Sequence, residues 1–177
     1  MTDDSGSVVV TPRTPLPSSE TAATLHVVLV APEIPPNTGS IARLCAATYT
    51  GLHLIRPLGF SLDDRYLKRA GLDYWPYVDV HAYDDWQQFR RQHPGARMHF
   101  FSARAARSYL EVAYAEGDYL VFGCETKGLP AALLAAHRNE TYVIPISSPH
   151  VRSLNLSNAV SIVVYEALRQ LGGIPLG

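Results

Sequence analysis

The chain has 177 residues, 47% of them hydrophobic, and a formal net charge of −1 at pH 7. This length predicts one domain with a substantial core, and the charge excludes a protein that attracts nucleic acid through its overall positive charge. Two distant cysteines, Cys45 and Cys124, predict reduced thiols in a cytoplasmic protein. The seven histidines lack paired ligand spacing, so we expect no metal. No apolar run is long enough to predict a membrane span.

The first 23 residues differ in composition from the rest of the chain. They are rich in Ser, Thr and Pro and lack the basic start and apolar stretch of a signal peptide. Their only basic side chain is Arg13, which argues against an RNA-binding tail. We therefore predict a disordered leader over residues 1–23, followed by a single domain over residues 24–177.

The predicted domain begins with a strand and a helix. Leu25 to Ala31 is a continuous apolar, β-branched run, typical of a strand buried on both faces of a parallel sheet. A proline-rich connection follows, and then Asn37 or Thr38 caps a helix that runs to about Tyr49 and is stopped by Gly51. The helical spacing directs four of its side chains to the core: Ile41, Leu44, Cys45 and Thr48.

Strands and helices alternate through the remainder of the chain. The sequence predicts strands at residues 52–57, 78–82, 98–102, 118–122 and 142–146. It predicts helices at residues 62–70, 84–92, 131–137 and from about 155 to 171. The aromatic segment at residues 71–77 indicates a packed surface or an interface. This alternation indicates an α/β domain with a mainly parallel sheet.

The final helix has an unusual first turn. Its body carries a broad apolar stripe at helical spacing: Leu156, Val160, Val163, Val164, Ala167, Leu168 and Leu171. Its first turn holds Asn155, Ser157 and Asn158 beside unpaired backbone N–H groups. A buried helix needs only one capping residue there, so the surplus indicates a ligand site, although these residues are also compatible with simple caps.

Two other stretches carry candidate chemistry. Arg43 stands among apolar neighbours on the helix after the prolines, where an arginine commonly pairs with an acid such as Glu33. Gly123 and Gly128 bound a turn after a buried strand, and this is the usual ligand edge of an open α/β sheet. The turn lacks the GxGxxG and GxxxxGKS patterns, so phosphate binding of a nucleotide is not predicted. Glycines also occur in turns that bind nothing.

Taken together, three stretches resemble the ordered motifs of the SPOUT class of RNA methyltransferases. They are PEIPPNTGSIARLC at residues 32–45, LVFGCETKGLP at residues 120–130, and IPI…RSLNLSNAVSIVVYEA at residues 144–167. The resemblance covers about residues 25–171. The lack of a separate RNA-binding domain, with RAGLDYW at residues 69–75, resembles the bacterial tRNA 2′-O-methyltransferases that act on the wobble cytidine or uridine.

The resemblance implies a fold, a cofactor and a substrate. The C-terminal segment would thread through a loop of the preceding chain to form a trefoil knot, an arrangement that sequence patterns alone would never suggest. S-adenosylmethionine would be bound by five residues: Phe101, Gly123, Ile144, Ser153 and Leu154. The catalytic residues would be Arg43, Ser157 and Asn158. The tRNA side of the site would contain Asn37, Glu125, Lys127 and Arg152, with Arg152 contacting tRNA across a homodimer.

The resemblance leaves the role of Arg43 open. One version makes it the general base for the ribose hydroxyl, although a guanidinium is almost always protonated. The other version has Arg43 hold the substrate phosphate and stabilise the developing alkoxide. Two departures from the family pattern are visible: Ser40 stands where relatives usually carry Asn, and the loop at residues 147–151 is about one residue longer.

Two consequences follow for assembly and for cofactor binding. The apolar stripe of the last helix is wider than one sheet face needs, so we expect the last helix and the proline-loop helix to pack against their copies in a homodimer. We also expect Gly123→Val to abolish cofactor binding without unfolding the chain, by filling the space of the ligand.

RNA phosphates would be bound by local basic groups: Arg65, Lys68 and Arg69; Arg104 and Arg107; Lys127 and Arg152.

Other functions fit the sequence less well. A ribosomal-RNA 2′-O-methyltransferase of the same class usually carries an added RNA-binding domain, for which 177 residues leave no room. A catalytically silent RNA- or adenosine-binding module would not need Arg43, Ser157 and Asn158. A dinucleotide-dependent oxidoreductase would show a glycine fingerprint after the first strand, and none is present.

Overall fold

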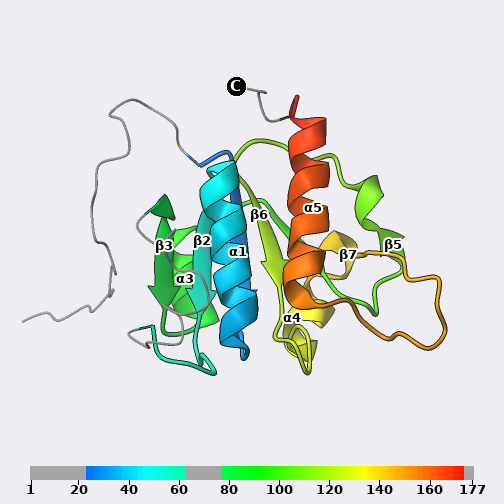
Figure 1. Cartoon of the computed structure of the whole chain (residues 1–177), viewed down its shortest axis with the longest axis horizontal. Helices are drawn as coiled ribbons and strands as arrows, with labels where there is room; N and C mark the ends of the chain where they lie inside the picture. The colour runs from blue at the N-terminus through cyan, green and yellow to red at the C-terminus, as the bar shows by residue number, and fades with distance from the viewer. Residues whose placement is uncertain (1–22, 63–76, 174–177) are drawn as a thin grey trace, which may run out of the picture.

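The computed structural model describes residues 23–62 and 77–173, which form an α/β/α fold (Figure 1). Within these residues a seven-stranded sheet has the order β3-β2-β1-β6-β4-β7-β5, with every neighbouring pair parallel. The strands are β1 Leu25–Val30, β2 Gly51–Ile55, β3 Val80–Tyr83, β4 Met98–Phe101, β5 Arg107–Ser108, β6 Asp118–Phe122 and β7 Thr141–Val143. The α-helices are α1 Pro35–Thr48, α3 Trp86–Gln92, α4 Ala131–Ala136 and α5 Leu156–Gln170. In the described ranges no helix is both long and apolar enough for a bilayer crossing.

The mainly parallel α/β sheet predicted from the sequence is confirmed, with one additional strand and with differences at the ends of several elements. Strand β7 ends at Val143, because Pro145 lacks the N–H that a longer ladder would require. Strand β5 was not predicted, since two residues show no alternation. Strand β3 begins at Val80, two residues later than expected. The predicted leader at residues 1–23 and the predicted helix at residues 62–70 lie outside the described residues except for residues 23 and 62, and the aromatic segment at residues 71–77 does so except for residue 77.

The start of α1 differs from the predicted cap. The helix begins at Pro35, and neither Asn37 nor Thr38 caps it; the N-cap position is Ile34, without a side-chain cap bond. Prolines are tolerated here because the first helical N–H groups have no partner within the helix. The expected stop at Gly51 is also wrong. The helix ends at Thr48, and the left-handed residue is Tyr49, with φ of 49°.

The helices cover both faces of the sheet. Helices α1 and α5 pack side by side on one face, and their apolar side chains join those of β1 and β6 in one core (Figure 1). Helices α3 and α4 contribute Phe89, Leu133 and Leu134 to the core on the other face. The stripe of α5 is therefore covered within this chain: Val160, Val163, Val164 and Ala167 are fully buried. The interpretation of this stripe as a dimer surface is wrong.

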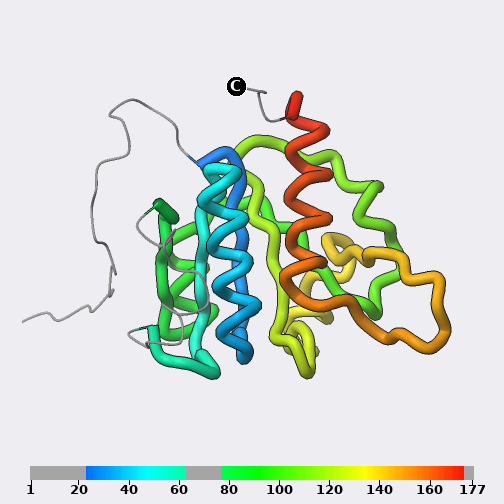
Figure 2. The backbone as a smooth tube through the Cα atoms, viewed as in Figure 1, coloured from blue at the N-terminus to red at the C-terminus, as the bar shows by residue number. Residues whose placement is uncertain are grey.

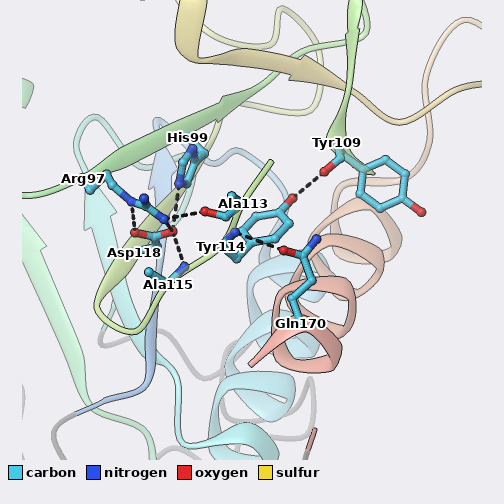
Figure 3. Close-up of polar contacts among 8 residues, drawn as sticks. All are labelled: Arg97, His99, Tyr109, Ala113, Tyr114, Ala115, Asp118 and Gln170. Carbon is cyan, nitrogen blue, oxygen red and sulfur yellow. Dashed lines mark hydrogen bonds and ion pairs between the residues drawn. The ribbon is translucent and has the colours of Figure 1, made fainter. Parts of the chain in front are cut away.

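A polar network ties α5 to the amino ends of the central strands (Figure 3). Asp118, at the start of β6, accepts two hydrogen bonds from Arg97, one from His99 and one from the Ala115 N–H. Burial alone would raise the pKa of Asp118, but these bonds lower it to about 2. In the neighbouring segment, the Tyr114 N–H donates to the side chain of Gln170 in the last turn of α5, at 3.1 Å.

A second network lies under α3 on the opposite face. Its side chains come from β1, β2, β3, β6 and the end of α3, and they form a continuous hydrogen-bonded chain with links of 3.0, 2.8, 2.9 and 3.0 Å: His26, His53, Tyr83, His93 and Tyr119. Tyr119 also stacks on His26 with ring centroids 4.3 Å apart. Every link can be formed with neutral rings, since each imidazole donates at one nitrogen and accepts at the other.

Burial makes these neutral rings the favoured form in the folded protein. It lowers the pKa values of His26, His53 and His93, with the neighbouring histidines adding to the effect for His53. His81, at the edge of the cluster, behaves oppositely: its hydrogen bond with Asp79 raises its pKa. Three histidines thus have lowered pKa values and one has a raised pKa, so the net effect of the cluster on stability follows the three lowered values.

We expect mild acid to destabilise the fold through this cluster. A histidine with a lowered folded pKa contributes its full stability above the unfolded value of 6.5, and the contribution is lost as pH falls below it. The free energy of unfolding should decrease by about 1–2 kcal/mol between pH 7 and pH 5, with His81 offsetting part of the loss. Urea unfolding at the two pH values measures this. Replacement of exposed His150 by Gln should leave the difference unchanged, and equal stabilities at both pH values would contradict the prediction.

Candidate functional site

The candidate site is a cavity of about 750 Å³ at the carboxyl edge of the sheet. It is lined by residues that follow β4, β6 and β7 and by the first turns of α1 and α5. The cavity lies beside the β1–β6 pair. From this pair the chain proceeds outward in opposite directions, to β2 and β3 on one side and to β4, β7 and β5 on the other. Ligands of open α/β sheets bind at such a reversal of strand order.

The structure brings together nine of the twelve predicted site residues. All five of the cofactor group line the cavity: Phe101, Gly123, Ile144, Ser153 and Leu154. The four expected on the substrate side line it as well: Asn37, Glu125, Lys127 and Arg152. The other three do not line the cavity. Arg43 lies on α1, about 9 Å along the helix axis from Asn37, and Ser157 and Asn158 lie in the first turn of α5.

Glu125 joins the glycine turn to the start of α1. Its carboxylate accepts hydrogen bonds from the backbone N–H groups of Glu33 and Ile34, at 2.8 and 3.1 Å, and from the side-chain amide of Asn37, at 3.0 Å. A carboxylate at this position satisfies donors at the helix entry and interacts favourably with the helix dipole. In return, the carboxylate of Glu33 accepts bonds from the Thr126 N–H and hydroxyl. These paired bonds hold both loops at the edge of the cavity.

Asn155 extends this network to α5. Its side-chain amide donates to Asn37 Oδ1 at 3.0 Å, and its own Oδ1 accepts from the N–H and hydroxyl of Ser157 at 2.9 and 2.6 Å. Asn155 is thus both the N-cap of α5 and the link between the two helices. The sequence predicted Asn155 as part of a polar first turn that is either a ligand site or a set of caps, and it did not predict the bond to Asn37.

Gly123 is required by the turn itself. A Cβ at this position would overlap the backbone of Gly128 and Leu129, which form the returning limb of the turn. The sequence analysis expected a side chain at Gly123 to fill the space of the ligand and leave the fold intact. The structure shows that the Cβ would instead collide with the turn. Substitution at Gly123 should disturb the folded turn as well as the cavity.

The cavity combines apolar walls with polar edges. Phe101 and Phe122 stack with ring centroids 4.9 Å apart, and Ile144, Leu154 and Leu156 complete the apolar lining. Ser102 and Arg104, which follow β4, also line the cavity. Ser102 was not predicted as a site residue, and Arg104 was predicted only as an RNA-phosphate contact paired with Arg107, not as a residue of this cavity. In the described part of the chain no cluster of His, Cys, Asp and Glu is arranged to hold a metal ion.

Comparisons with known proteins place this geometry in context. A model of the SpoU rRNA Methylase family matches residues 24–165. The tRNA (cytidine(34)-2′-O)-methyltransferase of Burkholderia cenocepacia is 52% identical over 149 residues, covering 83% of this chain and 96% of its own. The enzyme of the same name from Escherichia coli is 49% identical over 148 residues, covering 84% and 94%.

Solved structures show the same likeness. One, described as giving insight into 2-OH methylation of C/U34 on tRNA, matches with a TM-score of 0.79 at 53% identity and covers 84% of this chain and 96% of its own. The SpoU methyltransferase AviRb from Streptomyces viridochromogenes, in complex with AdoMet, matches with a TM-score of 0.74 at 23% identity, covering 87% and 63%. At that identity the second likeness supports the fold alone.

Proposed function

Because the chain belongs to the SpoU methylase family, we propose that it transfers a methyl group from S-adenosylmethionine to the ribose 2′-oxygen of the wobble cytidine or uridine of tRNA. The observation that carries this proposal is the identity of about half of all residues over almost the whole length of relatives named for that reaction. The cavity supports it, since the nine residues expected around cofactor and substrate converge there.

The cavity fits a nucleoside cofactor of this kind. Its volume of about 750 Å³ lies within the range of small-molecule sites, roughly 300–1,000 Å³. Phe101, Ile144 and Leu154 provide apolar surface for an adenine ring, and the backbone after β6 and β7 offers hydrogen-bonding groups for its polar edge. S-adenosylmethionine supplies an electrophilic methyl group on a positively charged sulfur. An apolar wall beside that sulfur would favour a reaction in which its charge disappears.

Arg43 is the residue that we propose acts on the ribose hydroxyl. Guanidinium groups in proteins are almost always protonated, so an arginine is better suited to stabilise the developing alkoxide than to remove the proton. Helix α1 carries both Arg43 and Asn37, and Glu125 fixes the start of this helix. Ser157, bonded to Asn155, and Asn158 orient the neighbouring polar groups on α5.

We also propose that the chain is knotted, as the family resemblance implies. After β7 the chain runs out through residues 147–154, drawn in orange, and returns along α5 beside α1 (Figure 2). In a trefoil knot this segment passes through a loop of the preceding chain. The cavity residues 152–154 would then lie on the threaded segment. The cavity would be complete only in the threaded chain, so cofactor binding would depend on threading.

The proposal includes a homodimer in the cytoplasm. Tyr49, directly after α1, is 66% exposed, and Ile162 and Tyr165 on α5 are 36% and 53% exposed. These side chains are available to contact a second copy, whereas the stripe of α5 is buried within this chain. Sedimentation showing a monomer at micromolar concentration would contradict the dimer.

The cytoplasmic location is supported by the two free cysteines, of which Cys45 is buried with a pKa raised by burial.

The reaction is tested by mapping the product. Purified protein is incubated with isotopically labelled S-adenosylmethionine and tRNA that lacks the modification, and the labelled nucleotide is located by mass spectrometry. We expect the label on the 2′-oxygen of the wobble nucleotide in a small set of tRNAs. A label on a base, or on ribosomal RNA alone, would contradict the proposed substrate.

A further inference from the structure

Three cationic side chains from three different loops line the candidate cavity. Arg104 follows β4, Lys127 lies in the glycine turn, and Arg152 lies in the loop before α5. All three are exposed, and within residues 23–62 and 77–173 none of them forms an ion pair. Like charges gathered without partners repel one another and lower stability, so the arrangement indicates an anionic ligand.

Glu125, the carboxylate among the residues lining the cavity, offsets only part of this positive charge, because it is one anion beside three cations and its oxygens are directed to other donors. The oxygens of Glu125 already accept three hydrogen bonds from the start of α1. The nearby Arg107, which the sequence grouped with Arg104, is in contrast fully engaged. It donates to the carbonyl of Asn139 at 2.7 Å, pairs with Glu111 at 3.4 Å and lies over the ring of Tyr142 at 4.9 Å. Of these two arginines, only Arg104 remains available for a ligand.

The backbone holds Arg104 at the edge of the site. The Arg104 N–H donates to the hydroxyl of Ser102 at 3.2 Å, and the Ala105 N–H donates to the Ser102 carbonyl at 3.2 Å. This tight turn directly follows Phe101, the last residue of β4. Arg104 thus projects from a fixed turn at the carboxyl end of a central strand, while its long side chain stays free to follow a flexible substrate.

We infer that Arg104 binds a backbone phosphate of the RNA substrate beside the nucleotide to be methylated, with Lys127 and Arg152 binding the phosphates around it. This inference rests on the proposed function. A protein with a net charge of −1 cannot attract RNA through its overall field, so its phosphate contacts must be local. A ribose that reaches the cavity has phosphates on both of its sides. Cations on separate loops around the opening suit this arrangement, and the guanidinium can donate two bonds to one phosphate.

The test measures how tRNA affinity depends on salt. In Arg104→Gln, with S-adenosylhomocysteine present, tRNA should bind about tenfold more weakly at low salt. The slope of log affinity against log salt concentration should become less steep by about 0.7, the value for one phosphate contact of a single strand. Calorimetry should show unchanged affinity for S-adenosylhomocysteine. The matched control is Arg91→Gln, an exposed arginine on α3 at the opposite edge of the sheet, which should change neither quantity.

Each other outcome overturns the inference in a distinguishable way. An unchanged salt slope in Arg104→Gln, with wild-type tRNA binding and methylation intact, overturns the role of Arg104 and leaves the proposed function standing. A loss of S-adenosylhomocysteine affinity with an unchanged slope would mean that Arg104 binds the carboxylate of the cofactor instead. A wild-type protein that neither binds nor methylates tRNA overturns the inference and the proposed function together.

Discussion

Replacing Arg43 by alanine should lower the turnover of tRNA by about a hundredfold or more while leaving the affinity for S-adenosylhomocysteine unchanged. The expected loss is that of an electrostatic group which acts on the oxygen that develops negative charge. Cofactor affinity should persist because Arg43 does not line the cavity. Single-turnover kinetics with saturating tRNA measure the first effect, and calorimetry measures the second.

Two controls separate chemistry from folding. Urea unfolding of the exposed Arg43→Ala variant should remain cooperative and show a loss of no more than about 1 kcal/mol, the usual scale for the contacts of one exposed charged side chain. Arg43→Lys keeps the positive charge and loses the planar fork, so its turnover should lie between the two. If Arg43→Ala turns over at a nearly normal rate, another residue stabilises the alkoxide, and the methyltransferase assignment itself survives.

Gly123→Ala should destabilise the protein by about 2–4 kcal/mol and abolish binding of S-adenosylhomocysteine. The added Cβ would overlap the backbone of Gly128 and Leu129, and backbone cannot move aside as a flexible side chain can. The turn would have to open, and Glu125 would move away from its three donors at the start of α1. Urea unfolding gives the stability and calorimetry gives the affinity.

Two other glycines provide graded comparisons. Gly128, in the same turn, has φ of +70° and open space around its missing Cβ, so Gly128→Ala should cost only the backbone strain, about 1–2 kcal/mol. Gly95 precedes β4, at the amino end of the strand and away from the cavity, and a Cβ there would meet no atom within 4 Å. Gly95→Ala should therefore be nearly neutral. A Gly123→Ala variant as stable as Gly95→Ala would show that the turn tolerates a side chain.

Much of the fold is predictable from local patterns. An apolar, β-branched run marks β1 and the apolar run at residues 119–122 marks β6, because a parallel strand is buried on both faces. The predicted bounds of β6 are those observed. The stripe of α5 likewise identifies its buried side. What covers that side is not a local property: α5 packs beside α1, more than 100 residues earlier in the chain, and the wrong assignment of the stripe to a dimer followed from this.

The candidate site was predictable to a similar degree and for a similar reason. Family resemblance identified nine of the residues that line the cavity, because an ordered motif indicates which positions belong to a site even where their contacts are unknown. Resemblance did not reveal that Glu125 supplies the anion at the start of α1, or that Asn155 links two helices. Both roles depend on hydrogen bonds between distant segments. The sequence grouped Arg104 with Arg107 as RNA-phosphate contacts, but it could not show that only Arg104 lines the cavity while Arg107 is held by Asn139, Glu111 and Tyr142.

The carboxylate bridge at Glu125 also determines when the site forms during folding. Its three donors precede it by 88 to 92 residues, so no short folded fragment can contain the bridge. The pairing of β1 with β6 closes a loop of the same size, so we expect the bridge to form together with that pair. Partly folded chains without this pair should therefore have helices and other strand pairs yet no ligand affinity. In a refolding experiment, the return of S-adenosylhomocysteine binding would act as a clock for completion of the central sheet.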